Sequence, residues 1–151
     1  MEEAQTGIRL RGRLIDSLYT EAMVLADEAR SYFDQAGRTE RETLTPLLRV
    51  TLSCESLKIT TRLMNMLSWL LTQRAVELGQ IDAVDARAPA DWHELDSDPA
   101  ALAGLPKAAI ELIDASRDLQ ARVRRIDSDI PDVMQPQSPA LGLLSRLERA
   151  F

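Results

Sequence analysis

Residues 45–78 read TPLLRVTLSCESLKITTRLMNMLSWLLTQRAVEL, and this stretch decides the fold because it is typical of one long helix. Thr45 can cap its first turn, and Pro46 stands at the first helical position, where proline is tolerated. Gly79 follows as the expected C-terminal breaker. Such a helix is about 50 Å long at roughly 1.5 Å per residue. We therefore expect the other helices of the chain to pack along it.

The middle of this helix is apolar on nearly every side, since residues 63–71 read LMNMLSWLL. A helix with apolar side chains all round must be covered all round. Two partner helices in one small bundle cover only part of that surface. We therefore predict a homodimer whose interface includes the apolar residues of this section: Leu63, Met66, Leu67, Leu70 and Leu71.

The rest of the chain predicts two more helices. Residues 1–12 are expected to form a loose leader. From 13 to 36 apolar residues recur at steps of three and four, which predicts an amphipathic helix that Gly37 ends, and residues 105–128 show the same spacing. Residues 80–104 form an acidic crossover loop. No segment has the alternating pattern of a strand, so the predicted fold is all-α, a three-helix bundle with a long central helix.

Residues 131–151 are predicted to form a flexible C-terminal tail, because Pro131, Pro136 and Pro139 prevent a packed helix there. A short amphipathic helix follows, and a helix of about twelve residues is marginal on its own. Its apolar stripe consists of Leu141, Leu144, Leu147 and Phe151. Two interpretations remain open: the stripe orders on a protein partner, or it packs back onto its own bundle.

Composition excludes several classes of function. The net charge of −6 argues against binding to nucleic acid or to an anionic membrane surface. The single cysteine cannot form an internal disulfide and fits a reducing cytoplasm. The first residues lack the apolar segment of a signal peptide, and the longest apolar stretch is too short to span a bilayer. We expect a soluble, cytoplasmic protein with no nucleic-acid or membrane partner.

No group of residues predicts catalysis. His93, the only histidine, stands in the acidic loop among Asp91, Asp96 and Asp98, but the spacing matches no metal site. Cys54 has no histidine nearby and lies on an apolar stripe, so we predict a small buried thiol. Trp92 is predicted to pack the acidic loop onto the bundle. The sequence thus predicts no catalytic residue, no metal and no cofactor, and a protein that is not an enzyme.

The long helix also carries a polar face. Glu55, Lys58 and Arg62 stand at positions i, i+3 and i+7, where they can form a ladder of ion pairs. One interpretation is that these and the other polar residues of the helix fix its register and the geometry of the dimer. The alternative is that they form a seam to which a cargo protein docks.

The third helix is locally basic in an otherwise acidic chain. Three interpretations fit this pattern: a solvated face, pairing with the protein's own acidic loop, or binding of an acidic protein partner. Nucleic acid fits poorly because no aromatic residue alternates with the arginines. With the apolar residues of the tail, these arginines are our candidate partner-binding residues: Arg117, Arg122, Arg124 and Arg125.

Three runs of sequence resemble a known family. ESLKITTRLM at 55–64, SWLLTQRA at 68–75 and LYTEAM at 18–23 resemble the regulator of CtrA degradation (RcdA-like) family of alphaproteobacterial helical proteins. The resemblance covers the first two predicted helices. It implies a three-helix bundle that dimerises and has a flexible C-terminal tail. It also implies a non-enzymatic adaptor that binds cell-cycle regulatory proteins and helps deliver them to the ClpXP protease.

Two other functions stay open at this point. The chain could be a structural helical dimer that holds another complex together. It could also be a small-ligand sensor with a pocket between its helices near Met64, Met66 and Trp69.

Overall fold

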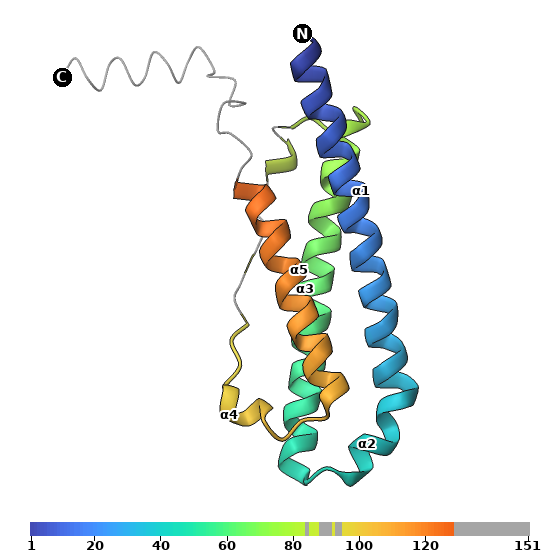
Figure 1. The fold of residues 1–151 in the computed structure, drawn as a ribbon, viewed down its shortest axis with the longest axis vertical. Helices are drawn as coiled ribbons and strands as arrows, with labels where there is room; N and C mark the ends of the chain where they lie inside the picture. The colour runs from blue at the N-terminus through green and yellow to red at the C-terminus, as the bar shows by residue number, and fades with distance from the viewer. Residues whose placement is uncertain (84, 88–91, 93–94, 129–151) are drawn as a thin grey trace, which may run out of the picture.

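The computed structural model describes residues 1–83, 85–87, 92 and 95–128. Within these residues all regular structure is helical, which confirms the predicted all-α class. The three long helices lie side by side along their lengths (Figure 1), and they are α1 (Glu2–Ser31), α3 (Pro46–Glu77) and α5 (Lys107–Ser128).

The direction of the helices explains the length of the crossover. The helix α1 runs antiparallel to α3, whereas α5 runs in the same direction as α3 (Figure 1). The chain must therefore return along the whole bundle between the end of α3 and the start of α5. The described residues of this return include two short helices, the 3-10 helix η2 (Asp85–Arg87) and α4 (Pro99–Leu102).

The predicted loose leader is wrong, because α1 begins at Glu2. The first ten residues are all exposed, so this part of α1 buries no side chain against the rest of the bundle. Two acidic residues in the first turn stabilise the helix, because their negative charges lie near the positive end of the helix dipole. Further along, the Arg11 Nη2 donates a hydrogen bond to Gln73 Oε1 at 2.8 Å, which ties this part of α1 to the end of α3.

The prediction that Gly37 ends the first helix is also wrong. The chain passes from α1 through a π-helix, η1 (Tyr32–Ala36), directly into α2 (Gly37–Thr43). Gly37 has a φ of −75°, which is ordinary helical backbone. Glycine is needed here because the main chain of Tyr32 lies close to it. A Cβ at this position would lie 2.7 Å from the main-chain oxygen of Tyr32. The Tyr32 hydroxyl donates to Glu40 Oε2 at 2.8 Å, which holds the wide turn together.

Both ends of α3 follow the signals in the sequence. The Leu48 main-chain N–H donates to the Thr45 hydroxyl oxygen at 3.3 Å, so Thr45 is the N-cap, and Pro46 occupies the first turn. At the other end Gly79 has a φ of +70°, which lies in the left-handed region, and its N–H donates to the Val76 carbonyl at 3.0 Å.

The core lies between the three long helices. Each contributes aliphatic side chains at steps of three or four residues, and the buried members include Ile15, Leu18, Ala22, Leu52, Ile59, Met66, Leu70, Ile113, Leu119 and Val123. These positions leave one side of α3 outside the bundle, which matters for the surfaces described next.

Candidate functional site

The polar face of α3 binds the chain that crosses over it. The Glu55 side chain is only 2% exposed, and its Oε1 accepts hydrogen bonds from Lys58 Nζ at 3.0 Å and from the Ser97 hydroxyl at 2.6 Å. Lys58 also donates to the main-chain oxygen of Asp96 at 2.9 Å. These residues, called the crossover latch below, hold residues 96–97 against the middle of α3.

The carboxyl group of Glu55 is kept charged by this arrangement. Burial raises its pKa, but hydrogen bonds from Ser97 and Lys58 and the charges of Lys58 and Arg62 outweigh that effect and leave the pKa below its ordinary value. The second oxygen, Oε2, is buried and has no hydrogen-bond partner among the described residues. Among the described residues, Glu55 therefore contributes to the latch through one of its two oxygen atoms.

Arg62, one turn beyond Lys58, is also 2% exposed. Its Nη1 donates to the Ser116 hydroxyl oxygen of α5 at 3.1 Å, and its Nη2 donates to the Leu95 carbonyl at 3.0 Å. Both acceptors are neutral. Burial, and then the charge of Arg117, lower the pKa of the Arg62 guanidinium, while Glu55 opposes them. The expected ladder of ion pairs is thus only partly formed, and these side chains fix the protomer's own crossover.

Trp92 packs the crossover onto the bundle, as predicted. Its Nε1 donates to Asp127 Oδ2 at 2.7 Å, and the Trp69 Nε1 donates to the other oxygen of the same carboxylate at 3.0 Å. The two indole rings lie 6.3 Å apart. One carboxylate near the end of α5 therefore connects the crossover to α3.

The four arginines of α5 have different surroundings. Arg122 forms an ion pair with Glu21 of α1, with its Nη1 donating to Glu21 Oε2 at 3.0 Å, and a second pair with Asp118 at 3.2 Å. It therefore joins α5 to α1 within the protomer. Arg125 is exposed, and its Nε donates to the Ala121 carbonyl at 3.4 Å.

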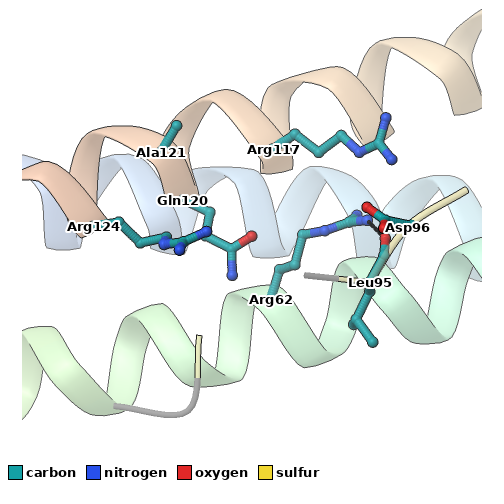
Figure 2. A pocket seen from close by; sticks show the side chains of 7 residues that line it. All are labelled: Arg62, Leu95, Asp96, Arg117, Gln120, Ala121 and Arg124. Carbon is teal, nitrogen blue, oxygen red and sulfur yellow. Dashed lines mark hydrogen bonds between the residues drawn. The ribbon is translucent and has the colours of Figure 1, made fainter. Parts of the chain in front are cut away.

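The other two arginines, Arg117 and Arg124, line a cavity of about 200 Å³ between α5, α3 and the crossover. Figure 2 shows them on α5 to either side of Gln120, with Arg62 reaching across from α3. We call this cavity the arginine pocket, and its lining residues are Arg62, Leu95, Asp96, Arg117, Gln120, Ala121 and Arg124. Sequence analysis pointed to the arginines but missed Gln120, although positions 117, 120 and 124 share one helical face.

The predicted dimer-interface residues divide into two groups. Leu63, Met66 and Leu70 are buried in the core of the protomer itself, with exposures of 5% or less. Leu67 is half-buried, and Leu71 is 49% exposed. Of the predicted set, only these last two are available to a second copy of the chain.

A different row of apolar residues runs along the outer side of α3. Its members are between 49% and 69% exposed and repeat every seven residues, and we call them the apolar seam: Val50, Leu57, Met64, Leu71 and Leu78. Cys54 lies between the first two and is exposed, so the predicted burial of its thiol is wrong. A seven-residue repeat is typical of helices that pair in a coiled coil, and this repeat was the signal that sequence analysis missed.

Of the three residues expected near a ligand pocket, Met64 lines a cavity between α1 and α3, whereas Met66 and Trp69 are buried. Met66 is fully buried, Trp69 bonds to Asp127, and Met64 is exposed, so the three side chains face different surroundings. The cavity between α1 and α3 measures about 370 Å³, and its lining includes Phe33, Leu63, Met64 and Leu67.

Within the described residues, no group of three or more His, Cys, Asp or Glu side chains is placed to hold a metal ion. The Asp98 side chain instead accepts from the Ala100 N–H and caps α4. Asp91 and His93 lie outside the described residues, as do Leu141, Leu144, Leu147 and Phe151 of the tail. Among the described helices, none combines the length and the apolar character needed to cross a bilayer.

Comparison with known proteins agrees with the resemblance seen in the long helix. The family described as "Protein of unknown function (DUF1465)" matches residues 8–151. The crystal structure of RcdA from Caulobacter crescentus CB15 is similar at 33% sequence identity and a TM-score of 0.60, over 76% of this chain and 88% of that chain. No curated protein matches this sequence. The chain therefore belongs to the DUF1465 family of RcdA-like helical proteins.

Proposed function

We propose that this protein is a non-enzymatic adaptor that binds cell-cycle regulatory proteins in the cytoplasm and helps deliver them to the ClpXP protease. The observation that carries the proposal is the similarity to RcdA, at 33% identity over 88% of that chain. The family resemblance of the runs in α1 and α3 implies this role. Its partners are a second copy of the chain, protein cargo and the protease-delivery machinery.

The surfaces of α3 support such a role, because an adaptor must hold more than one protein. Arg62 lines the arginine pocket, whereas Met64 belongs to the apolar seam. Residues two positions apart in an α-helix, such as Arg62 and Met64, differ by about 200° around the axis, so these surfaces lie on opposite sides of α3. A partner on one surface leaves the other accessible.

We propose further that the apolar seam pairs with the seam of a second copy. Five large apolar residues repeat at a spacing of seven over about eight helical turns, and they are exposed in the single chain. A repeat of seven residues keeps the same side of two supercoiled helices in contact. The seam replaces Met66 and Leu70, which the bundle itself covers, as the centre of the proposed interface.

Sedimentation of single variants tests the dimer. The changes Leu57→Glu and Met64→Glu each place a carboxylate in the proposed interface, and we expect each to weaken dimerisation by about 100-fold or more, or about 2.7 kcal/mol. The control is Met23→Glu, which changes an exposed methionine of α1 outside the seam and should leave a dimer. Wild-type protein that sediments as a monomer at micromolar concentration would contradict the proposal.

Delivery is tested by identifying the cargo and reconstituting its degradation. Crosslinking and mass spectrometry from a cytoplasmic lysate should identify cell-cycle regulators and ClpXP components. Purified ClpXP should then degrade the identified cargo faster when this protein is present. An unchanged rate would contradict the adaptor function and would favour a structural dimer, while stabilisation against heat by a small molecule would favour a ligand sensor.

A chain ending at Ile130 tests the contribution of the tail. If the tail is dispensable for folding, this truncation melts at nearly the same temperature as the full chain. We expect it to dimerise normally but to lose stimulation of cargo degradation. A truncation that melts many degrees lower instead supports a tail that packs on its own bundle.

A further inference from the structure

The arginine pocket concentrates positive charge in a chain whose net charge is −6. Among the described residues its lining carries three arginines and one carboxylate, that of Asp96. Burial, and then the charge of Arg117, lower the pKa of the Arg62 guanidinium, and the second of these effects is repulsion between two positive charges. Bringing these positive charges together destabilises the folded protein, and an anion bound in the pocket offsets the repulsion between them.

The pocket also holds a buried donor with no acceptor among the described residues. Gln120 is 7% exposed, and its Nε2 is buried without a hydrogen-bond partner in that part of the chain. A buried amide N–H without an acceptor destabilises the fold. Figure 2 shows this amide directed into the space between α5 and α3, on the side from which Arg62 approaches. An oxygen atom placed there accepts the hydrogen bond for which the described residues provide no acceptor.

The spacing of these residues suits an oxyanion. Arg117, Gln120 and Arg124 stand at positions i, i+3 and i+7 of α5, so they share one face, and Arg62 lies opposite on α3. A guanidinium group presents paired N–H donors that match the two oxygens of a carboxylate. The described lining comes from the interiors of α3 and α5 and from residues 95–96 of the crossover, and none of these residues stands at a helix N-terminus of the kind that binds phosphate.

The size of the pocket selects the kind of ligand. Its volume is about 200 Å³. Pockets that enclose whole small-molecule ligands measure about 300–1,000 Å³, so this one suits a single side chain better than a nucleotide. We propose that the arginine pocket binds a carboxylate side chain from an acidic segment of a protein partner. This inference rests on the proposed adaptor function and names a chemistry for one of its binding surfaces.

Binding of a defined peptide tests the proposal. The probe is fluorescein-labelled hexaglutamate, and hexaglutamine with the same label is the neutral reference. Fluorescence anisotropy at low salt should show binding of hexaglutamate only, and the affinity should fall as salt is added. Equal binding of the two peptides, or binding of neither, would overturn the proposal. Inorganic phosphate that displaces the peptide at equal or lower concentration would assign the pocket to phosphate instead, which also overturns it.

Two substitutions test whether hexaglutamate binds in the arginine pocket. Arg117→Gln removes one guanidinium, and Gln120→Leu removes the unsatisfied amide at similar size. Loss of a hydrogen bond to a charged group weakens binding by about tenfold or more, so we expect that loss in each variant. Arg125→Gln is the matched control, because Arg125 lies on the same helix outside the pocket. If this control weakens binding as much as Arg117→Gln, the whole basic face attracts the peptide and the pocket has no specific role.

Arg62 is left unchanged, since its bonds to Ser116 and Leu95 make it part of the fold. The melting temperature of each variant checks that it is folded. The degradation assay is separate from this test. Stimulated cargo degradation without hexaglutamate binding contradicts the pocket but leaves the adaptor function intact. Hexaglutamate binding without stimulated degradation contradicts the adaptor function and leaves the pocket as an anion site.

Discussion

Removal of the Ser97 hydroxyl should loosen the crossover from α3. In the folded protein this hydroxyl donates to Glu55 Oε1 at 2.6 Å and accepts from Lys58 Nζ at 3.1 Å. Ser97→Ala deletes both bonds and leaves the buried carboxylate with Lys58 as its remaining hydrogen-bond donor among the described residues. The substitution changes little volume, so the effect reports on hydrogen bonding rather than on packing.

The magnitude follows from the charge and burial of Glu55, which is 2% exposed. A hydrogen bond to a charged group contributes about 1.5–3 kcal/mol, compared with about 0.5–1.5 kcal/mol for a neutral pair. For a domain of this size about 1 kcal/mol shifts the melting temperature by roughly 2–4 °C. Thermal unfolding followed by circular dichroism at pH 7 should therefore show Ser97→Ala melting roughly 3–12 °C below the wild type.

The loss of stability in Ser97→Ala should also depend on pH, and the pKa of Glu55 determines the direction of that dependence. Its folded pKa lies below the ordinary value, so its contribution to stability is fully present above the unfolded pKa of about 4.3 and is lost as the pH falls through the folded pKa. Wild type and Ser97→Ala should thus differ most at pH 7 and least toward pH 3. The Glu55 pKa in the variant, followed by carboxyl carbon NMR shifts, should move upward.

Ser53→Ala is the control for this prediction. The Ser53 hydroxyl lies on the same helix but is exposed and donates only to the Arg49 carbonyl, so its loss should change the melting temperature very little. Three results would refute the reasoning: an unchanged melting temperature in Ser97→Ala, a penalty that is the same at pH 7 and pH 3, or an unchanged Glu55 pKa.

Three further substitutions test other parts of the fold. Gly37→Ala places a Cβ 2.7 Å from the Tyr32 carbonyl oxygen, so we expect a loss of about 1–3 kcal/mol in the free energy of unfolding, measured with urea. Trp92→Phe removes the bond to Asp127 and should cost about 1.5–3 kcal/mol, with a changed fluorescence emission from the remaining tryptophan. Arg122→Gln breaks a partly exposed ion pair with Glu21, so it should cost about 1 kcal/mol at most, and less in 1 M salt.

Signals carried by neighbouring residues predicted much of the structure. Thr45, Pro46 and Gly79 bound α3 because capping and left-handed backbone are decided within one turn. The positions of the core residues in α1 and α5 followed from spacing, since a helix buries only one side in a bundle. The all-α class and the family resemblance likewise came from the sequence of α1 and α3.

Local signals failed where a residue's environment depends on another part of the chain. The start of α1 buries no side chain, and Arg11 contacts a residue 62 positions away. Gly37 looks like a helix breaker in sequence, yet the packing of the Tyr32 turn against it is what requires glycine.

The candidate sites depended most on tertiary structure. Residues 63–71 are apolar on nearly every side, so composition could not separate the buried Met66 from the exposed Met64 and Leu71. Likewise the sequence shows that Glu55 carries a charge, but it does not show that Ser97, 42 residues away, donates a hydrogen bond to it. Sequence determined which helices form, because helices are stabilised by local bonds. Only the packing of those helices decided which side chains are buried, and therefore which of them are left to bind another molecule.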